Sequence, residues 1–107
     1  MKGWVYLLLS VDNLGLECHK VGISRYNPMK RIKQLSTGNG GQISLLNAYE
    51  SIYYQKIERL LHSKYNKYRT VSQNEWFQLP DEIVLDFLNE CKKADKTASL
   101  MRDNPFF

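Results

Sequence analysis

Residues 4–24 read WVYLLLSVDNLGLECHKVGIS, and this stretch decides the fold. Residues 4–10 are rich in aromatic and large aliphatic side chains, which favour a strand. The sequence Asp12-Asn13-Leu14-Gly15 that follows is typical of a tight turn. A second strand-like segment runs from His19 to Ser24. We therefore predict that the two segments form an antiparallel hairpin.

Alternation along the two strands separates two faces of this hairpin. Tyr6 lies on the opposite face from Val5 and Leu7, and Lys20 and Gly22 share one face of the second strand. The pattern predicts a core face and a cleft face that carries Tyr6 and Lys20. The glycine fits a close approach of phosphate or backbone, and an ordinary bulge explains it equally well.

A short basic helix and a third strand are expected next. Pro28 stands where a helix can begin, with Asn27 as its cap, and apolar residues recur at helical spacing until Gly38. After a glycine-rich loop, residues 43–49 alternate as a strand does. This segment should join the hairpin as the third strand of the sheet.

A second helix is predicted over residues 52–66. Its apolar positions, among them Ile57 and Leu61, form one stripe, while Glu58 and His62 belong to a neighbouring stripe. Glu58 lies roughly 100° from the centre of the apolar stripe by helix geometry. It should therefore stand at the edge of the core, where a polar side chain can reach a cleft.

The remainder of the chain is expected to cover the fold. Residues 75–79 form a short strand-like segment, and Pro80 opens a third helix with one apolar side. We expect one domain over residues 1–95 and a C-terminal tail over 96–107. The predicted class is α+β, a small antiparallel sheet of three or more strands flanked by about three helices.

Positive charge is concentrated in the middle of the chain. The net charge is +4, but residues 19–69 hold ten Lys or Arg against two acids, whereas residues 70–107 sum to −3. Such local concentration favours a polyanionic partner, although solvated helix faces are the ordinary alternative. The candidate nucleic-acid-binding residues are Arg25, Lys30, Lys33, Arg59, Lys64, Lys67 and Arg69.

Other features limit the class of protein. Cys18 and Cys91 lie far apart without paired spacing, which fits neither a zinc site nor a disulfide framework. The apolar run over residues 4–9 is too short to span a bilayer, and no signal peptide is recognised. The expectation is a cytoplasmic protein, bacterial or from a phage-infected cell, with no membrane partner.

The order of these elements and motifs resembles the GIY-YIG nuclease superfamily. Trp4-Val5-Tyr6 stands in the place of the first tripeptide and Lys20-Val21-Gly22 in the place of the second, with lysine replacing the usual tyrosine. The match is similar to a short branch common in phage genes and covers about residues 3–80. Its further motifs correspond to Lys20–Ser24, Arg31–Asn39, Glu58–His62 and Glu75–Phe77.

The resemblance implies a metal-dependent DNA endonuclease with Tyr6, Lys20, Arg31 and Glu58 as catalytic residues. Glu58 would be the protein ligand of one hydrated Mg²⁺ or Mn²⁺, since Mg²⁺ prefers oxygen ligands and keeps several waters. Arg31 would donate a forked pair of hydrogen bonds to the cleaved phosphate. His62, four residues after Glu58, could share the metal, orient Glu58 through a hydrogen bond or cap the cleft, and we favour the second role.

Two assignments stay open at this level. With Lys20 charged, Tyr6 would act as a tyrosinate base for the attacking water, whereas a neutral Lys20 could take the proton itself. Glu75 could supply a second carboxylate, but its aromatic neighbours favour a structural role.

The sequence also bears on specificity and partners. No separate DNA-reading module accompanies the core, so intrinsic base specificity should be low, or borrowed from a homodimer partner or a fused or separate specificity factor. The alternative from another class is a catalytically inactive phage effector that uses the same basic face to bind nucleic acid or a host protein.

Overall fold

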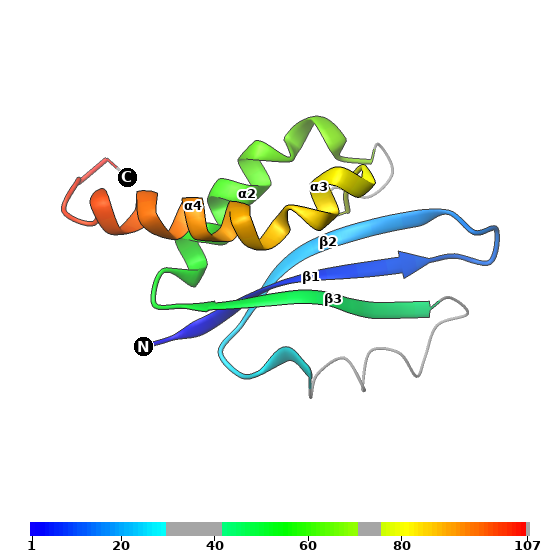
Figure 1. Ribbon diagram of the computed structural model, residues 1–107, viewed down its shortest axis with the longest axis horizontal. Helices are drawn as coiled ribbons and strands as arrows, with labels where there is room; N and C mark the ends of the chain where they lie inside the picture. Colours follow the sequence, from blue (N-terminus) through cyan, green and yellow to red (C-terminus); the bar gives the residue numbers. More distant parts are fainter. Residues whose placement is uncertain (30–41, 71–75, 107) are drawn as a thin grey trace.

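A computed structural model describes residues 1–29, 42–70 and 76–106, and it has the predicted α+β architecture (Figure 1). Three antiparallel strands form one sheet with the order β2-β1-β3. The strands are β1 (Gly3–Val11), β2 (Glu17–Ser24) and β3 (Gln42–Ser51). Because β1 is central, its hairpin partner β2 and the third strand β3 flank it on opposite sides.

The hairpin turn is fixed by one aspartate. Asp12 Oδ1 accepts hydrogen bonds from the backbone N–H groups of Leu14 and Leu16, each at 2.9 Å. Gly15 has a φ of +82°, a left-handed conformation that glycine adopts without a steric penalty. This turn sets the register in which Tyr6 pairs with Gly22.

Three helices and one 3₁₀ turn complete the described part of the chain. They are α2 (Tyr54–Lys64), η1 (Asn66–Tyr68), α3 (Asp81–Leu85) and α4 (Phe87–Leu100). Only the start of the basic helix is described. Asn27 Oδ1 accepts a hydrogen bond from Met29 N at 3.1 Å, as expected of its cap. The rest of that helix lies outside the described residues.

The helix expected to open at Pro80 is divided in two. Asp86 stands between α3 and α4, with a φ of −91° and a ψ of 2° that depart from helical values. The second piece runs on to Leu100, well past the point where the sequence turns polar. Ala94 and Ala98 are buried there, so small side chains extend the packed side of α4.

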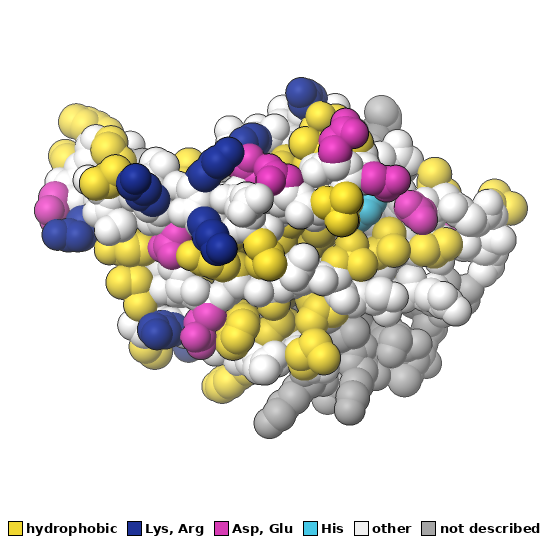
Figure 2. Space-filling model, viewed as in Figure 1, with side chains coloured by type: hydrophobic (Ala, Val, Ile, Leu, Met, Phe, Trp, Pro, Cys, Tyr) yellow, Lys and Arg dark blue, Asp and Glu magenta, His cyan; other side chains and the backbone are white. Residues whose placement is uncertain are grey.

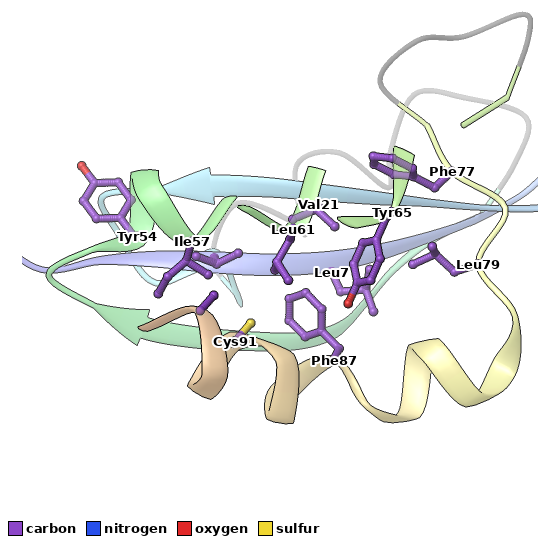
Figure 3. Packing of buried hydrophobic residues seen from close by; sticks show 12 residues of the cluster. Leu7, Val21, Tyr54, Ile57, Leu61, Tyr65, Phe77, Leu79, Phe87 and Cys91 are labelled. Carbon is purple, nitrogen blue, oxygen red and sulfur yellow. The ribbon is translucent and has the colours of Figure 1, made fainter. Parts of the chain in front are cut away.

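The core lies between one face of the sheet and the helices α2 and α4. Figure 3 shows the buried side chains of both layers pointing toward one another. They include Leu7 and Val21 from the hairpin, Ile57 and Leu61 from α2, and Phe87 from α4. Tyr6 and Leu8 are also buried but lie on the opposite face of β1, outside this cluster. The predicted separation of two hairpin faces is therefore confirmed.

Phe77 connects the segment after η1 to the sheet. Its backbone N–H and C=O bond the C=O and N–H of His19 at 2.7 and 2.6 Å, which forms a short bridge beside β2. The phenyl ring is fully buried and meets the rings of His62 and Tyr65 edge-on. The strand-like character predicted for residues 75–79 is thus limited, in the described part, to isolated bridges.

A second set of bonds attaches α4 to β3. Asp95 accepts hydrogen bonds from the hydroxyls of Tyr49 at 2.6 Å and Ser51 at 2.8 Å. Burial, together with the bond to Asp95, raises the pKa of Tyr49 to about 12. These bonds hold the helix over the strand that enters α2. Within the described ranges, no helix is both long and apolar enough to cross a membrane.

Replacing Phe77 by alanine should lower the free energy of unfolding by about 3–5 kcal/mol, because a fully buried phenyl group is lost and a cavity remains. Urea unfolding measures this change, and Phe77→Leu should cost much less. Phe106→Ala is the matched control, since that ring is 96% exposed. Equal costs for the two alanine variants would contradict the anchoring role.

Candidate functional site

The candidate site lies along the outer edge of β2, where three parts of the chain meet. Helix α2 packs on the hairpin and brings Glu58 and His62 toward this edge. Lys20 extends from β2, and Trp76 comes from the segment that bridges to His19. The strand edge thus gathers charged and aromatic side chains from separate regions of the sequence.

Glu58 is a half-buried carboxylate at the margin of α2, as helix geometry predicted. Burial raises its pKa above the ordinary value of 4.5, while the charges of His62 and Lys20 act in the opposite direction. The described residues provide it with no hydrogen-bond donor. Burial therefore disfavours the charged form of Glu58, and the positive charges nearby offset part of that effect.

His62 is held by the backbone of β2. Its Nε2 atom lies 2.8 Å from the carbonyl oxygen of Val21, and because a carbonyl only accepts, Nε2 carries the proton. The rings of His62 and Phe77 pack edge to face, with 5.5 Å between their centres. His62 is therefore fixed by β2 beside Glu58, and no hydrogen bond joins the two side chains in the described part of the chain.

Lys20 lies near both Glu58 and Trp76. Its Nζ atom is 5.9 Å from the centre of the Trp76 ring, within the range of a cation–π contact. Its charge also lowers the pKa of Glu58. The fold thus places Lys20 close enough to Glu58 for its charge to act on the carboxyl group. Trp76 joins them, although the sequence indicated only a structural role for its segment.

Tyr6 of β1 pairs with Gly22 of β2, and its side chain extends over that glycine. A Cβ atom on Gly22 would lie 2.5 Å from both Cζ and Oη of Tyr6, closer than real contacts allow. The register irregularity lies between β1 and β3, at Leu7 and Leu8, so no bulge explains this glycine. Gly22 instead gives the phenol ring room to lie over the strand that carries Lys20.

The candidate nucleic-acid-binding residues differ in their surroundings. Lys64 forms an ion pair with Glu90. The Cζ atom of Arg69 lies 4.9 Å from the centre of the Phe77 ring, and its Nε donates a hydrogen bond to Asn66. The Nζ atom of Lys67 lies over the ring of Tyr68. Arg25 and Arg59 are exposed. Outside the described residues lie Arg31, Lys30, Lys33 and Glu75.

The face formed by α3 and α4 has a mixed charge. Figure 2 shows Lys and Arg side chains over α4, with Asp and Glu side chains between them and over α3. Such a surface has no uniform positive potential to attract a polyanion. In the described part of the chain, no three His, Cys, Asp or Glu side chains lie close enough together to share a metal ion as common ligands.

Replacing Gly22 by alanine should lower the free energy of unfolding by about 1–3 kcal/mol, because the new methyl group collides with the Tyr6 ring. The same substitution should cost clearly less when Tyr6 is already leucine. Denaturant unfolding of both single variants and the double variant measures this coupling. An unchanged cost in the Tyr6→Leu background would show that the contact is not the cause.

Comparison with known proteins adds the family. No curated protein and no solved structure matches the chain. Residues 3–92 match the model of the T5orf172 domain, which spans β1 through the first turns of α4. This domain is phage-associated and is linked to nuclease-type folds. The match extends over most of the 107 residues, and the chain therefore belongs to the T5orf172 domain family.

Proposed function

We propose that this protein is a metal-dependent DNA endonuclease of the GIY-YIG type with little intrinsic sequence specificity. The observation that carries the proposal is the half-buried Glu58 carboxylate beside Lys20, at the strand edge that the Tyr6 ring crosses. Membership of a family linked to nuclease-type folds supports it. The motif order that contributes Arg31 supports it as well.

The surroundings of Glu58 fit a divalent cation. A carboxylate that is partly desolvated and receives no hydrogen bond from the described residues would gain from a bound positive charge. Mg²⁺ or Mn²⁺ with one protein carboxylate and several waters suits this donor set. When bound, the ion would supply charge neutralisation at the phosphate and activation of a water molecule.

The other residues would prepare the phosphodiester for attack. We propose that Arg31 donates two parallel hydrogen bonds to the phosphate, a geometry that suits a guanidinium group. Lys20 would work as a cation, since both the Trp76 ring and the Glu58 carboxylate attract positive charge. Tyr6, as tyrosinate, would then accept a proton from the attacking water.

One such site per chain would cut one strand at a time. A monomer would therefore nick supercoiled plasmid before any linear product forms, whereas immediate double-strand breaks would indicate a dimer. DNA in a bacterial or phage-infected cytoplasm would be the substrate. The lysine in place of the second-motif tyrosine also favours one rival, an inactive effector that binds through the same surface.

Glu58→Gln should abolish plasmid nicking in Mg²⁺ or Mn²⁺ while leaving DNA affinity nearly unchanged, because the amide keeps the shape but removes the charge that a hard cation requires. Relaxation of supercoiled plasmid, with a chelator control, measures the activity. Glu50→Gln is the matched control, since that glutamate is exposed on β3. Full activity in Glu58→Gln would refute the metal assignment. If the parent protein does not nick plasmid with either metal, the result favours the inactive effector.

Without metal, Glu58→Gln should raise the melting temperature at neutral pH by roughly a few degrees. Burial raises the pKa of Glu58 in the folded state, so its charged form costs stability above the unfolded pKa. This cost decreases as the pH falls from the folded pKa to the unfolded pKa, and the difference between variant and parent should shrink with it. Calorimetry at neutral and mildly acidic pH tests this, and a lower melting temperature for the variant would contradict it.

A further inference from the structure

A pocket of about 300 Å³ lies where β2 ends and the chain turns toward Pro28. The first turn of α2 forms its other side. Its lining brings together two phenol rings, a guanidinium group, a carboxamide and a hydroxyl. Tyr54 belongs to the core, whereas Arg25, Tyr26 and Gln55 are exposed and have no part in the proposed catalytic chemistry. Its lining residues are Ile23, Ser24, Arg25, Tyr26, Tyr54 and Gln55.

The turn that carries Tyr26 is held on both sides. Ser24 is buried, and its Oγ accepts a hydrogen bond from Tyr26 N at 3.1 Å. Pro28 is fully buried, and the side chain of Asn27 accepts a bond from Met29 N. Between these anchors the Tyr26 side chain is 80% exposed. A large aromatic ring is thus presented to solvent from a fixed backbone.

The opposite side of the pocket is equally defined. The Tyr54 ring is buried against Gly3, where a Cβ atom would lie 2.7 Å from three of its ring carbons. Gln55, the next residue, is exposed. The pocket therefore combines a fixed apolar wall with an exposed ring, a cation and an amide that can both donate and accept hydrogen bonds.

This combination matches the chemistry of an unpaired nucleobase. A base has a flat π face that stacks on tyrosine, and its edge forms hydrogen bonds with guanidinium and carboxamide groups. A paired base in a duplex offers no free face for such stacking. None of the described residues that line the pocket is acidic, which also fits a nucleic-acid strand.

The pocket adjoins the proposed catalytic site. Tyr54 and Glu58 are four residues apart on one side of α2, which corresponds to about 6 Å along the helix axis. A strand whose phosphate lies near Glu58 can therefore place a neighbouring base in the pocket that Tyr54 helps to line. Arg25 directly follows β2, the strand that carries Lys20. It adds a positive charge to the pocket lining.

We propose that this pocket binds an unpaired base of a DNA strand next to the phosphodiester that is cut. The base stacks on Tyr26, while Arg25 and Gln55 bind its edge. The inference rests on the proposed nuclease function for the identity of the strand. It makes single-stranded, flapped or mismatched DNA a better ligand than a fully paired duplex, since an unpaired base costs less to place in a pocket.

Binding of a fluorescein-labelled single-stranded DNA oligonucleotide, measured by anisotropy with chelator present, tests the proposal without cleavage. Tyr26→Ala should weaken binding by about 5- to 150-fold, the loss expected when one base–aromatic stack is removed. Tyr26→Phe should bind as the parent does. Phe106→Ala is the matched control, because it removes another highly exposed ring far along the sequence, beyond α4.

The matching fully paired duplex completes the test. Tyr26→Ala should change duplex affinity little, because its bases remain stacked in the helix. Unchanged single-strand affinity in Tyr26→Ala, equal losses for both DNA forms, or a Tyr26 effect seen only with RNA would each overturn the proposal. Melting temperatures confirm that each variant is folded.

The outcome is separable from that of the proposed catalysis. If the protein does not cut plasmid but its single-strand binding depends on Tyr26, the base pocket stands and the nuclease assignment fails. If it cuts plasmid through Glu58 while Tyr26→Ala binds as the parent does, the reverse holds. Glu58→Gln should retain the dependence of binding on Tyr26.

Discussion

Ile57 and Leu61 of α2 are fully buried against the β1–β2 hairpin, and this packing fixes the rotation of the helix about its axis. Successive helix residues are about 100° apart, so Glu58 and His62, each one position further on, fall at the margin of the contact. From there both reach the edge of β2. An apolar contact thus decides where the polar groups of the candidate site stand.

Much of this arrangement could be predicted from the sequence because it depends on local periodicity. Alternation over residues 4–24 gave the two faces of the hairpin, and the helical repeat gave the marginal position of Glu58. The break at Asp86 and the extension of the last helix to Leu100 were not predicted. The packed side of that extension consists of alanines, which give a weak hydropathy pattern even where they are buried.

Contacts between distant segments explain what the sequence could not reveal about the site. Trp76 reaches Lys20 only because Phe77 bridges to His19, and no local pattern indicates that pairing. The ion pair of Lys64 likewise depends on Glu90, 26 residues away. The role of Gly22 requires the direction of the Tyr6 ring, which strand alternation does not specify. Tyr26 did have a signal, an aromatic residue in a turn just before Asn27-Pro28.

The bonds that His62 and Phe77 make with β2 have a consequence for self-association. As an outer strand of the sheet, β2 would otherwise present backbone groups that a strand from another molecule could join. The imidazole of His62 already uses the carbonyl of Val21, and Phe77 uses both backbone groups of His19. Strand addition along this side would have to break those bonds first. The same residues that frame the candidate site therefore protect the protein from aggregation through the edge of β2.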